Sequence, residues 1–172
     1  VHMAGQSADM RSIHALSKKY NFKIIEDASH AIGASYLDEK VGSCRYSDVT
    51  VFSFHPVKII TTGEGGVAVT NSEVIASKMR QLRSHGITRD PKDWTKKQHD
   101  AWYYEMVNLG YNYRLTDLQA ALGLSQMTQL NQNVKKRNDL ALKYGNLLNS
   151  DKLILPYVNE TTNSAYHLYI VQ

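Results

Sequence analysis

The sequence has few of the features that disulfide-rich, secreted or membrane-spanning proteins need. Cys44 is the only cysteine among 172 residues, which excludes an internal disulfide and favours a reducing compartment. No apolar run approaches the roughly 20 residues that cross a bilayer, and no secretory signal peptide is visible. These absences predict a cytoplasmic protein without a membrane partner.

Charge is also sparse. Charged residues make up 21% of the sequence, and the formal net charge is +4. The one compact basic run, residues 135–137, lies in a helical pattern where a solvated face is the favoured interpretation. Basic and aromatic residues do not alternate and no zinc-ligand spacing occurs, so we expect neither a nucleic-acid partner nor a metal site. With 42% hydrophobic residues, the chain is long enough for one domain with a core.

Apolar periodicity predicts a chain in which helices and strands follow one another. The expected helices cover residues 8–20, 73–84 and 117–148, the last with a break near residues 131–133. The expected strands cover residues 22–27, 49–54, 67–69 and 166–172, with a minor hairpin at residues 36–41. In the helix at residues 73–84, Val74 is expected on the buried side. This order argues for an α/β sheet with crossover helices.

Residues 49–69 contain a strand, a polar turn with the single lysine Lys58, a glycine cluster and a second apolar run. A lysine between two hydrophobic runs is expected to pack its stem and direct its amine to the end of the sheet, where α/β sheets bind ligands. Burial lowers the pKa of a lysine, and a neutral amine reacts with carbonyl groups. A hairpin with a solvated lysine is the alternative that this stretch alone leaves open.

Asp27 falls at the carboxyl end of the strand at residues 22–27, on the same predicted rim as Lys58. A carboxylate beside a reactive lysine is what pyridoxal phosphate requires, because the lysine forms the Schiff base and the carboxylate pairs with the protonated pyridine nitrogen. Ser53 and His55, around the turn, are placed to donate hydrogen bonds to the cofactor. Asp27 by itself would also fit a capping or loop carboxylate; the pair with Lys58 favours the cofactor site.

Three blocks then carry a family resemblance. EDASHAIGASY (residues 26–36), FSFHPVKIITTGEGG (residues 52–66) and LGYNYRLTDLQAALG (residues 109–123) resemble the signature blocks of the DegT/DnrJ/EryC1/StrS sugar aminotransferases. The resemblance spans nearly the whole chain and implies an aspartate-aminotransferase-like PLP fold type I, an α/β fold with a mixed, mostly parallel sheet and flanking helices. Residues 1–150 would be the carboxyl-side part of the PLP-binding large domain, and residues 151–172 the start of an incomplete small domain. We therefore expect a piece of a longer enzyme.

The resemblance also implies roles for single residues. Lys58 matches the Schiff-base lysine, which also moves the proton at the C4 carbon of the sugar. Asp27 matches the partner of the pyridinium, and His30 matches a residue that contacts the cofactor ring. Ser53 matches a phosphate ligand. Asn112 matches a residue supplied across a dimer interface to the partner's phosphate, although a turn residue between two tyrosines is the alternative.

Three further residues are candidates for contact with substrate. His55 lies in the turn that carries the lysine. His85 and Arg114 match positions where family members contact the sugar nucleotide or the partner subunit. We predict that all three residues contact the substrate.

The implied reaction is a ping-pong transamination by a homodimer with shared active sites. A PLP-dependent aminotransferase would convert a nucleotide-linked 4-keto-6-deoxy sugar to the 4-amino sugar, with glutamate as the amino donor. The turn at residues 55–58 and residues 84–90 resemble most the members that act on UDP-sugars of the pseudaminic acid type. The alternatives are another sugar-nucleotide aminotransferase of the family, or a non-catalytic fragment that acts as a dimerisation module. For the chain alone, weak cofactor retention and little turnover are expected.

Overall fold

The structure is a computed structural model that describes residues 1–96, 100–148 and 151–172. The chain forms two compact units, residues 1–71 with 117–172, and residues 72–116. No helix in the described ranges has the length and apolar character needed to cross a membrane. The predicted domain boundary after residue 150 adjoins residues 149–150, which lie outside the described residues, and it stays a prediction.

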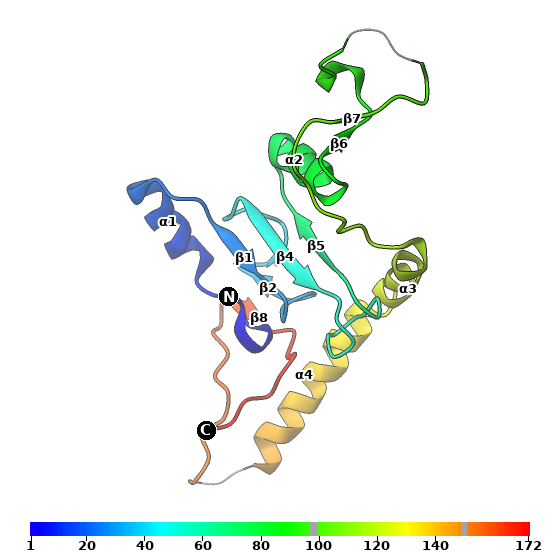
Figure 1. Ribbon diagram of the computed structural model, residues 1–172. Coiled ribbons are helices and arrows are strands. Elements are labelled where there is room, and N and C mark those ends of the chain that lie inside the picture. The colour runs from blue at the N-terminus through cyan, green and yellow to red at the C-terminus, as the bar shows by residue number, and fades with distance from the viewer. Residues whose placement is uncertain (97–99, 149–150) are drawn as a thin grey trace. The chain divides into compact units, whose positions relative to one another are not determined.

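The first unit is built around a mixed three-stranded sheet (Figure 1). Its strand order is β1-β4-β5, with β1 parallel to β4 and β4 antiparallel to β5. A second sheet, β3-β2-β8, is antiparallel. The elements of this unit are η1 (Met3–Gly5), α1 (Met10–Tyr20), β1 (Ile25–Asp27), β2 (Ser35–Tyr36), β3 (Glu39–Lys40), β4 (Val49–Ser53), β5 (Gly66–Val69), α3 (Asp117–Met127), α4 (Leu130–Leu147) and β8 (Thr162–Asn163). The predicted α/β fold with a mixed sheet and the hairpin near residues 36–41 are confirmed.

The second unit contains one long helix and a short hairpin. Its elements are α2 (Glu73–Arg83), β6 (Ile87–Thr88), η2 (Pro91–Asp93) and β7 (Glu105–Met106), with β6 antiparallel to β7. The Ser72 hydroxyl accepts a hydrogen bond from the Ile75 N–H, so Ser72 is the N-cap of α2. The prediction that this helix buries Val74 is wrong, because Val74 is 82% exposed within the described chain.

Several element boundaries differ from the predicted ones for local reasons. Helix α1 begins at Met10 because Asp9 is its non-helical N-cap and accepts a hydrogen bond from the Ser12 N–H. The long helix does break, but after Met127, where α3 ends, rather than at residues 131–133. Residues 166–172 do not form the predicted strand, and Tyr166 at their start has a left-handed φ of 44°.

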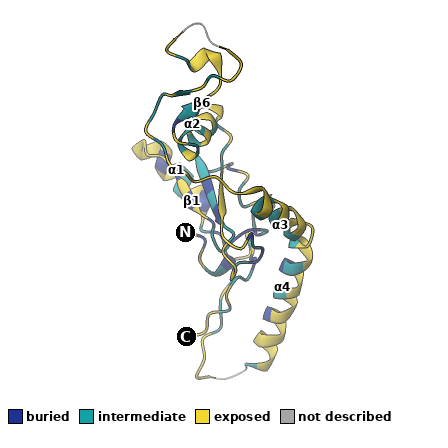
Figure 2. Cartoon of the chain, turned by 45° about the vertical axis from the view of Figure 1, so that its right-hand side comes forward, coloured by how far each residue is buried: buried dark blue, intermediate teal, exposed yellow. Residues whose placement is uncertain are grey.

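Small side chains let helix α4 approach the turn that follows β1. Ala28, Ala31 and Ala34 are fully buried, and Val134 of α4 belongs to the same hydrophobic cluster. The element that packs against these alanines is therefore α4. Figure 2 shows α4 as mostly exposed, with a few buried positions along it. The full cluster comprises Ala28, Ala31, Ile32, Ala34, Phe52, Ile59, Ile60, Val134 and Ala165.

A buried hydrogen-bond network centres on Glu26, which is 7% exposed. Its Oε2 lies 2.6 Å from Nε2 of the fully buried His2. Its Oε1 accepts hydrogen bonds from the hydroxyls of Ser47 and, at 3.0 Å, Thr50. The Ala8 N–H donates to His2 Nδ1 at 3.1 Å, so Nδ1 is the acceptor and the Nε2–H donates to Glu26. The network ties the segment before α1 to strand β1.

These contacts decide the ionisation of Glu26. Burial raises the pKa of Glu26, but the hydrogen bonds from His2, Ser47 and Thr50 outweigh it, and the pKa lies below its ordinary value of 4.5. A carboxyl group with a lowered native pKa stabilises the fold above the ordinary pKa, and this contribution is lost as the pH falls through the native pKa.

We expect Glu26→Gln to lower the free energy of unfolding at pH 7 by about 2 to 4 kcal/mol, because the amide cannot accept all three hydrogen bonds and leaves buried donors unpaired. The difference in the free energy of unfolding between wild type and variant should become smaller as the pH falls below 4.5. Urea unfolding at a series of pH values measures both effects. Glu39→Gln is the control, since its ion pair with Arg45 is partly exposed and should change stability by less than about 1 kcal/mol. A gap that stays constant with pH would contradict the prediction.

Candidate active site

The parallel strands β1 and β4 end at the same edge of the sheet. Asp27 is the last residue of β1, and Ser53 is the last residue of β4. The Ala28 N–H donates to the Val51 carbonyl at 2.8 Å, which continues the pairing just beyond the end of β1. Asp27 is exposed while the neighbouring Glu26 is buried, as the alternation of side chains along a strand requires.

The carboxylate of Asp27 is held in its ionised form. Its Oδ1 accepts a hydrogen bond from the Ser29 N–H at 3.0 Å. Hydrogen bonding from the side chain and then the backbone of Ser29 lowers the pKa of Asp27 below its ordinary value. An ionised carboxylate at this edge can pair with a cationic ring nitrogen.

Lys58 lies in a loop that is fixed at both ends. The Phe54 N–H donates to the Gly65 carbonyl at 2.8 Å, and the Phe54 carbonyl accepts from the Thr62 N–H at 3.0 Å. Lys58 itself is half-buried, and the next residues, Ile59 and Ile60, are buried in the main hydrophobic cluster. The core therefore anchors the loop directly beside the lysine.

His30 connects the acid and the amine. Burial lowers the pKa of His30, the charge of Lys58 lowers it further, and the charge of Asp27 acts in the opposite direction. Since both charges act on the same ring, the electrostatics indicate that Asp27, His30 and Lys58 lie near one another. The assignment of each to a cofactor contact stays a prediction.

A second histidine, His167, lies against His30. The two ring centroids are 4.4 Å apart with an interplanar angle of 36°. In the described part of the chain, Nδ1 of each ring is buried without a hydrogen-bond partner. Burial, followed by the charges of His30, Lys58 and Arg137, lowers the pKa of His167 to about 4.

His55 and Ser53 interact mainly within their own loop. The His55 N–H donates to Ser53 Oγ at 3.4 Å, and His55 Nδ1 accepts from the Val57 N–H at 3.3 Å. His55 Nε2 lies 3.9 Å from Glu64 Oε1, an ion pair when the imidazole is protonated. The predicted roles of His55 with substrate and of Ser53 with phosphate stay predictions.

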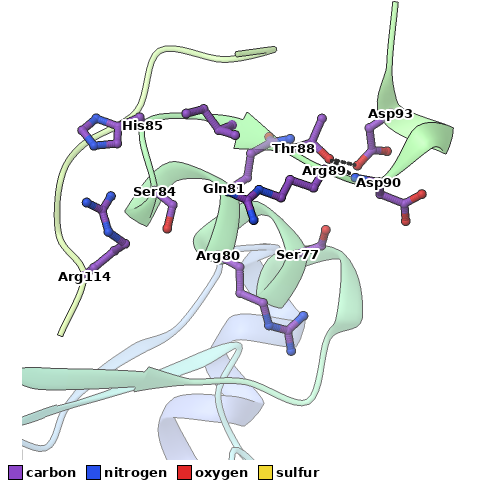
Figure 3. A pocket seen from close by; sticks show the side chains of 11 residues that line it. Ser77, Arg80, Gln81, Ser84, His85, Thr88, Arg89, Asp90, Asp93 and Arg114 are labelled. Carbon is purple, nitrogen blue, oxygen red and sulfur yellow. Dashed lines mark hydrogen bonds between the residues drawn. The ribbon is translucent and has the colours of Figure 1, made fainter. Parts of the chain in front are cut away.

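In the second unit, His85 and Arg114 line one cavity of about 540 Å³ (Figure 3). Arg80 from α2 and Arg89 from the segment after β6 also line it. The lining carries more positive than negative charge, which suits an anionic ligand. The complete lining is Ser77, Arg80, Gln81, Ser84, His85, Ile87, Thr88, Arg89, Asp90, Asp93 and Arg114.

Two of these arginines are already oriented by neighbouring side chains. Nη1 of Arg80 donates to Glu73 at 3.0 Å, and the guanidinium of Arg89 lies 5.8 Å from the centroid of the Tyr104 ring. Asn112 belongs to the same unit, is exposed, and forms an isolated antiparallel bridge with Ser84.

The sequence did not indicate His167, Arg80, Arg89 or Arg137 as site residues. The run at residues 135–137 was assigned to a solvated face; Lys135 and Lys136 are exposed as expected, but Arg137 is not. Arg137 is half-buried, and its Nη1 donates to the carbonyls of Tyr166 at 3.1 Å and His167 at 3.2 Å. The signal that was available is its position three residues after the buried Val134 on one helix face.

Comparison with known proteins matches the whole chain to one family. The model of the DegT/DnrJ/EryC1/StrS aminotransferase family matches residues 1–172. The UDP-4-amino-4,6-dideoxy-N-acetyl-beta-L-altrosamine transaminase of Campylobacter jejuni is 44% identical over 174 residues, which cover 98% of this chain and 42% of that protein.

Solved structures agree with this match. PseC of Helicobacter pylori, an aminotransferase involved in the biosynthesis of pseudoaminic acid, has a TM-score of 0.86 and 34% identity, over 99% of this chain and 43% of PseC. Spr1654 of Streptococcus pneumoniae in its PLP-form has a TM-score of 0.84 and 28% identity, over 99% of this chain and 46% of Spr1654. These similarities confirm the predicted PLP fold type I. The chain spans less than half the length of the relatives it matches.

The cavity of the second unit depends on Gly86. Its φ is +69°, and a Cβ at this position would lie 1.7 Å from the Asn108 carbonyl oxygen. We expect Gly86→Ala to destabilise the β6–β7 hairpin by about 3 kcal/mol or more, because the backbone at residue 86 and the backbone at Asn108 must move apart. Hydrogen exchange of the amides at residues 84–90 measures the loss of protection.

Gly63→Ala is the matched control for this substitution. Gly63 also has a left-handed φ, +80°, but nothing lies within 4 Å of the added Cβ. It should cost only the conformational strain of about 1 kcal/mol. Hydrogen exchange of the amides around each substituted glycine gives the local loss of stability. Equal losses at the two positions would show that backbone strain, and not the contact with Asn108, decides the outcome.

Proposed function

Because the chain belongs to the DegT/DnrJ/EryC1/StrS aminotransferase family, we propose that it is part of a pyridoxal-phosphate-dependent aminotransferase that converts a nucleotide-linked 4-keto-6-deoxy sugar into the 4-amino sugar. The observation that carries the proposal is the grouping of Asp27, His30 and Lys58 where β1 and β4 end. The similarity to the C. jejuni transaminase and to PseC supports a UDP-sugar of the pseudaminic acid type. We propose glutamate as the amino donor.

The donor set fits pyridoxal phosphate. Asp27 offers an ionised carboxylate for a ring nitrogen, Lys58 offers a primary amine, and His30 offers an imidazole N–H for a ring oxygen. Ser53 is placed at the same edge as a hydroxyl donor for the phosphate. Bound here, pyridoxal phosphate would supply an electron sink for the transfer of the amino group.

The residues of the chain divide the remaining tasks. Asp27 would hold the ring nitrogen of the cofactor in its protonated form, because the charge of Asp27 is stabilised by Ser29. Nζ of Lys58 would deliver to C4 of the sugar the proton that it takes from the carbon of the cofactor, and its anchored loop keeps the amine in position. We assign Asn112 to the cofactor phosphate held by a second copy of the chain.

The cavity of the second unit suits the phosphates of a nucleotide. We assign His85 and Arg114, which both line it, to this role, with Arg80 and Arg89 adding positive charge. Arginine binds phosphate oxygens through paired N–H donors, which gives both affinity and orientation. His55 is kept as a proposed substrate contact from the lysine loop.

We further propose a homodimer with shared active sites. Among the described residues, none of helix α3 is buried, although Leu118, Leu122 and Leu124 are apolar and Leu118 is 86% exposed. An apolar helix that the described chain leaves exposed supports the proposal that a second subunit covers it in the assembled enzyme.

Lys58→Ala tests the central assignment. The full-length wild-type enzyme that contains this chain should develop a visible absorption band with pyridoxal phosphate that the full-length variant lacks, because the covalent link requires the amine. Turnover of a 4-keto UDP-sugar with glutamate should fall by at least about 100-fold. Spectrophotometric titration, followed by borohydride reduction and peptide mass mapping, measures the link to Lys58.

Lys136→Ala is the control for this test, since Lys136 is exposed on α4. An unchanged band in the Lys58 variant, or a reduced adduct on another lysine, would refute the assignment. Wild-type protein that binds nucleotide sugar without forming a band would favour a non-catalytic module. A panel of 4-keto and 3-keto nucleotide sugars separates this reaction from that of other family members.

Arg114→Gln tests the nucleotide site. We expect its affinity for UDP to fall about tenfold, equivalent to about 1.4 kcal/mol, through loss of a charged hydrogen-bond donor. Titration calorimetry at two salt concentrations measures the affinity, and added salt should shrink the difference. The control is Arg83→Gln, an exposed arginine of α2 that does not line the cavity. Equal loss in both variants would indicate a general charge effect instead of a site.

A further inference from the structure

His30 and His167 form a stacked pair that the described chain leaves incompletely hydrogen-bonded. The rings lie 4.4 Å apart, centroid to centroid, and Nδ1 of each is buried without a partner among the described residues. His30 follows β1, and His167 follows β8. Buried polar atoms are nearly always paired, so two adjacent exceptions require an explanation.

Helix α4 holds both histidines in one rigid arrangement. Arg137 donates to the carbonyls of Tyr166 and His167, and Asn138 Nδ2 donates to the Ser164 carbonyl at 2.9 Å. Ala31 and Ala165, which neighbour the two histidine segments, are fully buried in the same cluster as Val134 of α4. The contact between the rings is therefore fixed by the core.

The surroundings oppose a positive charge on the pair. The charge of Lys58 acts on both rings, the charge of Arg137 acts on His167, and among the described residues the acid that acts on His30 is Asp27. Protonation at Nδ1 would bury an N–H without an acceptor and add a cation beside Lys58. The proton of each neutral ring consequently belongs on Nε2, and Nδ1 keeps its lone pair.

We propose that His167 is a positioning residue for His30. Its ring and the hydrogen bonds from Arg137 to its segment hold His30 as a neutral imidazole whose Nε2–H donates to an oxygen of the ligand bound beside Lys58 and Asp27. The identity of that ligand rests on the proposed function; the positioning of His30 does not. A neutral donor stabilises a partly negative oxygen without adding a second cation to the site.

Histidine NMR tests the proposal without a ligand. In protein labelled with ¹⁵N-histidine, His30 and His167 should both show the Nε2–H tautomer and titrate below the ordinary imidazole pKa of 6.5. His167→Ala should expose His30 to water, raise its pKa toward 6.5 and allow both tautomers. His167→Phe keeps a ring in the stack and should preserve the neutral Nε2–H form of His30.

The control is His14→Ala, because His14 contacts the Tyr46 carbonyl elsewhere in the first unit. It should leave the titration of His30 unchanged. An Nδ1–H tautomer in wild type, or a His30 titration unaffected by His167→Ala, would overturn the proposal. The amide spectrum shows whether each variant keeps its fold, and His167→Phe provides the test if His167→Ala does not fold.

Binding of pyridoxal phosphate tests whether the positioning of His30 by His167 affects the affinity for the ligand. We expect its affinity to fall about tenfold in His167→Ala and to be largely retained in His167→Phe. Unchanged affinity in His167→Ala would refute the link from the pair to the ligand. If the full-length wild-type enzyme shows the expected tautomers yet binds no pyridoxal phosphate, the proposed function fails while the positioning of His30 stands.

Discussion

Successive side chains of strand β1 point to opposite faces of the sheet, and this alternation gives two neighbouring acids different environments. Glu26 turns inward, where His2, Ser47 and Thr50 satisfy its oxygens. Asp27 turns toward the edge where β1 and β4 end. The parallel register of Asp27 with Val51 sets where the loop carrying Lys58 begins. A slip of one residue would place the buried network at the site and the reactive carboxylate in the core.

The second constraint is the close approach of helix α4 to the turn after β1. Fully buried alanines allow it, and it brings Arg137 and Asn138 to the backbone of residues 164–167. One helix thereby fixes two segments that are far apart in sequence. The pair formed by His30 and His167 is a consequence of this packing, since neither ring is held by a hydrogen bond at Nδ1 within the described residues.

The sequence predicted those parts of the site that depend on local pattern. Asp27 and Lys58 were found because each follows a recognisable strand, and the strand ends of an α/β sheet share an edge. His167 carries no such signal, because its role depends on a contact with a residue in another segment. Arg137 was misassigned because helical periodicity does not reveal which carbonyls a long side chain can reach. Val74 was misplaced because periodicity identifies an apolar face without showing that a described element covers it.

Electrostatics explains why a neutral histidine pair suits a site that already holds cations. Two like charges about 5 Å apart repel by about 3 kcal/mol at an effective dielectric constant near 20, which corresponds to about two pKa units. A protonated His30 would impose repulsion of this order on any nearby cation, including a ring nitrogen whose proton Asp27 stabilises. Burial and the charges of Lys58 and Arg137 remove this conflict by keeping the imidazoles neutral. The negative charge of Asp27 is then left for the ligand instead of being neutralised by the neighbouring histidine.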